Sequence, residues 1–185
     1  MALPKLTAPK YQIEVPSTKK MIEYRPFLVK EEKVLMMAQE SEDPKQLQSA
    51  VEDIIETCTY GAIKPSELTA YDLEYIFLNL RAVSVGETVE VGIKCEHCDK
   101  VNQIVVNLKE IKVQFPEVEP ETTIMLEKDI GITMKPITLG ATKLLADDAE
   151  ITDMVGLVID TIFDNDNVYP TKDSSVEEIK DFVES

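Results

Sequence analysis

Apolar and polar residues follow two different periods along this chain, which predict helices first, strands in the middle and helices again at the end. From Val29 onward, apolar residues recur every three or four positions, as on one face of a helix. A second helix is predicted after Asp43-Pro44, because aspartate caps a helix N-terminus and proline fits its first position. We expect the second helix to bury Cys58, and Met36 and Met37 of the first to fill core space rather than form a binding surface.

A third helix is predicted after Thr69, because Thr69 and Asp72 have the spacing of a capping box. This helix is apolar on most sides, which is typical of a helix that is central to a core or covered by a partner. Tyrosine and arginine are enriched among the anchor residues of interfaces. The candidate partner-binding residues, with core packing as the competing interpretation for Phe77, are Tyr75, Phe77, Leu78 and Arg81.

After Gly86 the period changes to two, which is the period of a strand. Apolar residues alternate with polar ones from Val89 to Cys95, and further strands are predicted at residues 101–108 and 111–115. Together they form an antiparallel meander whose tight turn is the segment from Cys95 to Lys100. Other strand pairs are predicted for residues 11–15 with 21–27 and for 124–127 with 130–136.

The C-terminal part is predicted to be helical at residues 139–149 and 151–162, with a polar loop at 164–174 and a last helix capped by Ser174 or Ser175. The fold class is therefore α+β: N-terminal helices, a central antiparallel β meander with a cysteine turn, and C-terminal helices. We divide the chain into four segments, packed as one compact unit or two lobes. They are an arm with edge strands at 1–28, a helical lobe at 29–85, a β region at 86–136 and a helical segment at 137–185.

Charge and composition narrow the function classes. The chain has 19 basic and 35 acidic residues, a net charge of −16, and such a field repels nucleic-acid phosphates. No apolar run reaches the roughly 18 to 20 residues of a membrane span, and the N-terminus lacks the apolar region of a secretory signal. Three cysteines do not form a disulfide framework, so we expect a reducing cytoplasm.

The Cys-Glu-His-Cys turn is the only pattern with metal chemistry. Cys95 and Cys98 have the spacing of two zinc ligands, but a closed zinc site needs four. The other ligands would have to include His97 in strained geometry, Cys58, or a second copy of the chain. The turn is an intact zinc site, a decayed zinc-ribbon turn or an unrelated turn with two thiols. Redox chemistry is disfavoured, because the first thiol ends a strand instead of starting a helix.

Patterns of enzymes and cofactor sites are otherwise missing from the sequence. The segment from Asp164 begins like a calcium loop, but Tyr169 stands where glycine is needed and Ser175 where glutamate is needed. With one histidine and no glycine-rich phosphate loop, a catalytic role is disfavoured. Apart from the zinc option, we expect no cofactor.

Two segments carry a family resemblance: Arg25 to Lys33, read RPFLVKEEK, and Asp72 to Gly86, read DLEYIFLNLRAVSVG. With the order of elements, they resemble a T-even-type bacteriophage baseplate protein family that includes a hub subunit and a hub assembly chaperone. The resemblance spans about residues 20–185, and similar family members continue past this point. It implies a non-enzymatic assembly protein that binds other baseplate hub or tail proteins, in the host cytoplasm during assembly or in the virion baseplate.

Two other functions compete with this expectation. The first is a zinc-stabilised protein-binding module unrelated to phage tails, in which stoichiometric zinc would be essential for folding. The second is a hydrolase, which needs a convergent pocket of carboxylates that the sequence does not show. Whether the protein stays in the finished virion is left open by the sequence.

Overall fold

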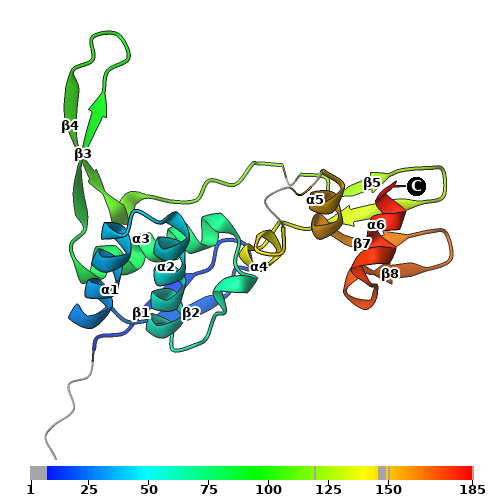
Figure 1. Cartoon of the computed structure of the whole chain (residues 1–185), viewed down its shortest axis with the longest axis horizontal. Helices are drawn as coiled ribbons and strands as arrows, with labels where there is room; N and C mark the ends of the chain where they lie inside the picture. The colour runs from blue at the N-terminus through cyan, green and yellow to red at the C-terminus, as the bar shows by residue number, and fades with distance from the viewer. Residues whose placement is uncertain (1–7, 119, 146–148, 150, 185) are drawn as a thin grey trace, which may run out of the picture. The chain divides into compact units, whose positions relative to one another are not determined.

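The computed structural model describes residues 8–118, 120–145, 149 and 151–184. The chain divides into two compact units, Met1–Gln114 and Phe115–Ser185, which are coloured blue to green and green to red in Figure 1. Both units combine helices with antiparallel strands, so the α+β class is confirmed.

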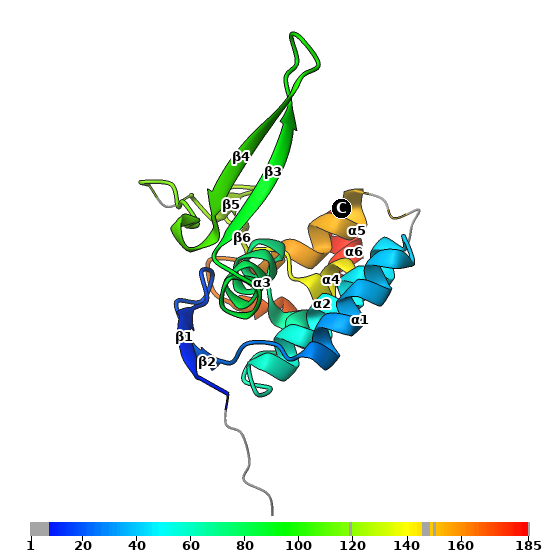
Figure 2. The ribbon, with the colours of Figure 1, turned by 90° about the vertical axis from the view of Figure 1, so that its left-hand side faces the viewer.

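Unit 1 begins with a short hairpin followed by three helices. Strands β1 (Tyr11–Glu14) and β2 (Met21–Tyr24) pair antiparallel, as predicted. Helices α1 (Val29–Glu40) and α2 (Pro44–Cys58) pack along each other (Figure 2), and α3 (Ala70–Ser84) follows after a 3₁₀ turn at Pro65–Glu67.

The predicted helix caps are confirmed. The Asp43 carboxylate accepts a hydrogen bond from the backbone N–H of Lys45 at 2.9 Å, and Pro44 occupies the first turn of α2. Thr69 and Asp72 form a reciprocal capping box at the start of α3. Local sequence therefore sets where these two helices begin.

The core of unit 1 lies between α2, α3 and the first hairpin. Cys58 is fully buried, as predicted. Asp72 is also fully buried, and its carboxylate accepts hydrogen bonds from the Ser17 backbone N–H at 2.9 Å and the Thr69 hydroxyl at 2.6 Å. One side chain thus joins the β1–β2 turn to α3. Other apolar residues that are fully or nearly fully buried include Val15, Ile54, Ile55, Ile76 and Leu80.

Strands β3 (Thr88–Lys94) and β4 (Val101–Asn107) form a two-stranded hairpin that stands out from the helices of unit 1 (Figures 1 and 2). The predicted third strand at 111–115 is wrong, because no strand forms there. A 3₁₀ turn at Leu108–Glu110 buries Leu108, and the Leu108 N–H donates to the Glu87 carbonyl, which closes the ladder. The chain then leaves the hairpin instead of continuing it.

Unit 2 contains a four-stranded antiparallel sheet. Its strands are β5 (Thr123–Met125), β6 (Gly131–Met134), β7 (Ile159–Phe163) and β8 (Val168–Pro170), in that order across the sheet. The predicted hairpin of β5 and β6 is confirmed. Its helices are α4 (Leu139–Thr142), α5 (Ile151–Val158) and α6 (Val176–Glu184), and α6 confirms the predicted last helix.

The C-terminal part is less helical than predicted. The predicted helix at 151–162 ends at Val158, and the chain continues as β7, which pairs with β6 and β8. Residues 159–163 are rich in β-branched and aromatic side chains that suit a strand, and pairing on both sides overrides helical periodicity. The predicted helix at 139–149 is helical only over α4, and residues 146–148 of it lie outside the described residues.

The acidic loop after β7 forms a turn, and β8 lies within the predicted polar loop. Oδ1 of Asp164 accepts hydrogen bonds from the N–H groups of Asp166 and Asn167 at 2.8 and 2.7 Å. The Tyr169 hydroxyl donates to its other oxygen. These hydrogen bonds lower the pKa of Asp164 and shape the connection between β7 and β8.

Candidate docking surfaces and the cysteine turn

The turn at the tip of the β3–β4 hairpin has a defined backbone geometry. The Cys95 N–H donates to the Lys100 carbonyl at 2.9 Å, and the Asp99 N–H donates to the Cys95 carbonyl at 3.0 Å. Asp99 has a φ of 57°, in the left-handed region that aspartate tolerates. Its carboxylate lies 2.8 Å from the Lys94 ammonium. The tip is thus held by its own backbone, with an exposed ion pair across it.

The two thiols of the turn lie together. The Cys95 sulfur accepts hydrogen bonds from the backbone N–H groups of His97 and Cys98 and from the Cys98 thiol, and these hydrogen bonds lower the pKa of Cys95. Cys98 is exposed and Cys95 is half-buried. Because the thiolate is the form that binds metal, the turn favours the state in which Cys95 can act as a ligand.

The third thiol belongs to a different environment. Cys58 lies in the last turn of α2, where burial raises its pKa to about 11 and keeps it protonated at neutral pH. Among the residues that the structure describes, no group of three or more His, Cys, Asp or Glu side chains converges on a possible metal position. The structure therefore brings Cys95 and Cys98 together, but adds neither Cys58 nor His97 to them as a third ligand.

The hairpin itself is amphipathic. Cross-strand partners share a face in an antiparallel pair, so the register places five β-branched residues on one side. We call this side the aliphatic face; it consists of Val89, Val91, Ile93, Ile104 and Val106. The opposite face is mostly polar, although it includes Val101 and Val105.

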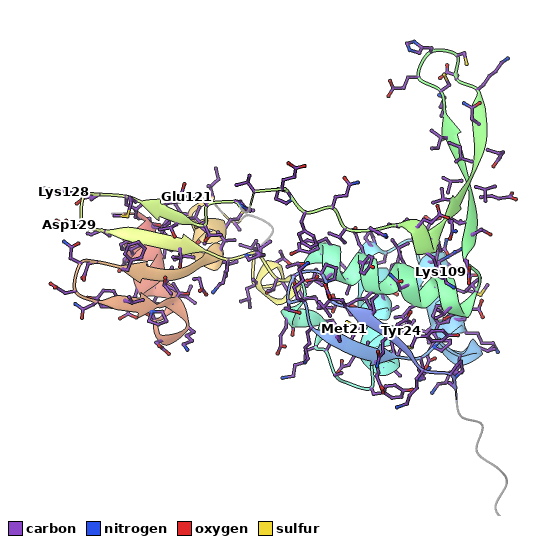
Figure 3. The ribbon with its side chains drawn as sticks, turned by 180° about the vertical axis from the view of Figure 1, so that it is seen from behind. Met21, Tyr24, Lys109, Glu121, Lys128 and Asp129 are labelled. Carbon is purple, nitrogen blue, oxygen red and sulfur yellow. The ribbon has the colours of Figure 1, made fainter. Side chains whose placement is uncertain are left out.

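Exposure of the aliphatic face increases from the base of the hairpin to its tip. Val89 and Val106, near the base, are half-buried, whereas Ile104 is 43% exposed and Ile93 is 51% exposed. At the base an ion pair joins Glu87 to Lys109, which is labelled in Figure 3. Beyond it no other described element of unit 1 lies against the hairpin side chains in that view. An isolated two-stranded hairpin is marginally stable in water, so this face gains from being covered.

The α3 residues proposed from the sequence are less accessible. Tyr75, Phe77, Leu78 and Arg81 are all half-buried, and Tyr75 lies near Tyr24 of β2. Nη1 of Arg81 is buried and has no hydrogen-bond partner among the described residues. These side chains contribute to the packing of unit 1 and leave only part of their surface to a partner.

The two methionines of α1 are exposed and do not fill the core as the sequence predicted. Met36 is 56% and Met37 is 70% exposed, so the prediction that they fill the core is wrong. On α1 the apolar side chains are spread around the helix, and its buried side is formed instead by Ala38 and by Glu31. Met37 and Val34 line a groove between α1 and α2.

Glu31 is buried because it has an ionic partner. Its carboxylate lies 2.8 Å from the Arg25 guanidinium and also accepts a hydrogen bond from the Leu28 N–H at 2.6 Å. The hydrogen bond from Arg25 is the main cause that lowers the pKa of Glu31 and raises that of Arg25. The pair fixes the start of α1 against β2 and serves the fold.

Unit 2 has a separate apolar groove that the sequence analysis missed. It lies beside α5 and α6, where Gly156 lets the helices approach closely; a Cβ there would lie 3.3 Å from Ile179 Cγ2. The groove has a volume of about 640 Å³ and its apolar lining includes Leu144, Leu145, Leu157, Val176 and Ile179. The glycine in an otherwise amphipathic helix was the available sequence signal.

The family model described as T4 bacteriophage base plate protein matches residues 8–185, which is nearly the whole chain. The chain belongs to the T4 bacteriophage base plate protein family. The resemblance found in the sequence is thus confirmed, and a module unrelated to phage tails is excluded.

The assignment of the chain to a family rests on this match to the base plate family model. No curated protein and no solved structure matches the chain. Within the described part of the chain, none of the helices has both the length and the apolar composition needed to cross a bilayer.

Proposed function

We propose that this base plate family member is a hub subunit or a hub assembly chaperone that acts through protein–protein contacts and not as an enzyme. Its partners are other hub or tail proteins, which it meets in the host cytoplasm during assembly. The observation that carries the proposal is the aliphatic face of the β3–β4 hairpin, an ordered apolar surface with little cover in its own unit.

The energetics favour burial of this face by another polypeptide. Removing apolar surface from water yields roughly 25 cal/mol per Å², before the entropic cost of association is subtracted. Val91, Ile93 and Ile104 supply such surface in a pre-formed arrangement, so little further ordering is needed. The net charge of −16 opposes non-specific aggregation of free copies through this apolar surface.

Helix α3 supplies a second, smaller part of the proposed contact. Tyr75, Phe77, Leu78 and Arg81 are half-buried, so each retains some exposed surface for a partner. We expect the loss from changes on α3 to combine weakened binding with weakened folding, because these residues also pack in unit 1.

Co-expression with baseplate hub proteins tests the proposal. We expect a complex that co-purifies, and a rise in the soluble fraction of at least one hub protein. The absence of both effects would contradict the proposal.

A pair of neighbouring substitutions tests the surface. Ile104 and Val105 are adjacent on β4 but point to opposite faces. Ile104→Ser should weaken the complex, whereas Val105→Ser, at the more exposed position, should leave it nearly unchanged. Equal effects of the two changes would show that the aliphatic face is not the contact.

Mass spectrometry of purified virions separates the two proposed roles. A hub subunit remains in the particle at a fixed ratio to the other baseplate proteins. An assembly chaperone is found in infected cells and is absent from the particle.

A further inference from the structure

The cysteine turn contains half of a metal site in a ready geometry. Cys95 and Cys98 stand three positions apart in the turn at the tip of the hairpin, and this turn is closed by backbone hydrogen bonds from the Cys95 N–H to the Lys100 carbonyl and from the Asp99 N–H to the Cys95 carbonyl. A turn whose backbone is already ordered loses little conformational freedom when a metal binds to its side chains. The turn is therefore better ordered for metal binding than a flexible loop that contains two thiols.

The number of ligands shows that the site is incomplete within one chain. A structural zinc ion takes four ligands in a tetrahedron, and thiolates are among its preferred ligands. The turn supplies two, and among the described residues no third His, Cys, Asp or Glu side chain converges with them. Cys58 is sealed in the core of unit 1. The described residues of one chain therefore leave two ligand positions open, and a second copy can fill both.

We infer that the hairpin tips of two copies of this chain meet around one zinc ion, each copy contributing Cys95 and Cys98. Two copies related by a twofold axis supply two thiolates each, which completes a four-thiolate tetrahedron with no other residue. The inference goes beyond the proposed function and does not depend on it.

The local charge of the tip favours contact between copies. The chain as a whole carries −16, which opposes self-association. From Lys94 to Lys100, however, two lysines balance Glu96 and Asp99, so the formal charge is zero. Two tips can thus approach without the repulsion that the rest of the surface would cause.

The shape of unit 1 also favours contact between the tips of two copies. The seven residues of β3 reach about 23 Å at the usual rise of a strand, and they carry the tip away from the helices of that unit. Two tips can therefore meet without a collision between those helices. The aliphatic faces of both hairpins remain available along the arms.

The full chain, purified from a zinc-containing medium without chelator, provides the test. We expect elemental analysis to find one zinc ion per two chains, and light scattering to find a dimer that a strong chelator converts to monomers. With cobalt in place of zinc, the absorption spectrum should show thiolate charge-transfer bands and the pattern of a tetrahedral site.

Variants at the tip test whether Cys95 and Cys98 are the residues that bind the zinc ion. Cys95→Ser with Cys98→Ser should abolish both bound zinc and dimer, while circular dichroism stays unchanged because the tip is exposed. His97→Asn and Cys58→Ala are the matched controls, and both should retain one zinc ion per dimer.

Several results would overturn the inference. They are a chain without bound zinc, a dimer that persists without metal, zinc bound to a monomer, and zinc bound only when a hub protein is present. A dimer that reductant alone dissolves would instead identify an intermolecular disulfide and would likewise overturn it.

Discussion

Two regions of unit 1 use similar aliphatic residues in opposite ways. In the core between α2, α3 and the first hairpin, Ile55 and Leu80 are fully buried. In the β3–β4 hairpin, Ile93 and Val105 are more than half exposed, although the two strands pair without interruption along their length. The residue types are similar, so the difference lies in the number of layers that cover them.

This difference separates what the chain needs for folding from what it offers to others. The core has helices and a hairpin on several sides and is complete within unit 1. The projecting hairpin is one sheet layer without a second layer, and stable domains are built from at least two. Its missing layer is the expected place for a partner.

The largest effect should come from truncating the core. We expect Leu80→Ala to lower the free energy of unfolding of unit 1 by about 2–5 kcal/mol, because it removes packed atoms and leaves a cavity. Ile93→Ala in the hairpin should change it by less than about 0.5 kcal/mol. Urea denaturation followed by tyrosine fluorescence measures this, since five of the six tyrosines lie in unit 1. Similar losses at both positions would remove the distinction between the regions.

The next effect concerns the buried polar link of the core. Asp72→Ala removes the capping box of α3 and leaves the Ser17 N–H without its acceptor. We expect a loss of about 2–4 kcal/mol from these two causes together. Asp53→Ala, at an exposed position on α2, is the control and should be close to neutral. The same denaturation experiment compares them, and equal stabilities would show that Asp72 does not join the elements.

A smaller effect, dependent on pH, is expected at Glu31. Its folded-state pKa lies below the ordinary value near 4.5, so the ionised form stabilises the fold above that pH. This contribution is lost as the pH falls through the folded-state pKa. We expect Glu31→Gln to cost about 1–3 kcal/mol at pH 7 and much less near pH 3.

Its neighbour provides the control for that measurement. Glu32 is exposed on the same helix, so the unfolding free energy of Glu32→Gln should follow that of the unchanged chain from pH 7 to pH 3. A Glu31→Gln deficit that stays constant over this range would show that ionic pairing with Arg25 is not its cause.

The smallest effect is expected at the tip of the hairpin. The Lys94–Asp99 pair has both side chains more than two-thirds exposed, and exposed ion pairs contribute little. Lys94→Gln should shift the unfolding free energy by at most about 0.5 kcal/mol. In amide hydrogen exchange the Cys95 N–H, which donates to Lys100, should keep its protection. Loss of that protection would mean that the ion pair, and not the backbone, holds the turn.

The sequence predicted the features that depend on neighbouring residues. The caps at Asp43 and Thr69, the burial of Cys58 and the β5–β6 hairpin all follow from spacing and turn chemistry within a few positions. The alternation from Val89 to Cys95 likewise placed the cysteine turn at the end of a strand. The two segments around Arg25 and Asp72 were enough to find the family that the match over residues 8–185 confirms.

Other features depended on contacts that no local pattern contains. Residues 159–163 have helical periodicity, yet they form β7 because β6 and β8 pair with them on both sides. Met37 is exposed because Ala38 and the Arg25-paired Glu31 form the buried side of α1. The predicted strand at 111–115 is replaced by an irregular segment after Leu108 enters the core.

By itself, then, the sequence determined the starts of α2 and α3, the Cys-x-x-Cys spacing of the turn and the acidic charge, because each depends only on residue identity and short spacing. Only the tertiary structure decided that the hairpin lacks a covering layer and that Cys58 is sealed away from the turn. Burial is a property of what the rest of the chain places beside a residue, and periodicity specifies a face without specifying what covers it.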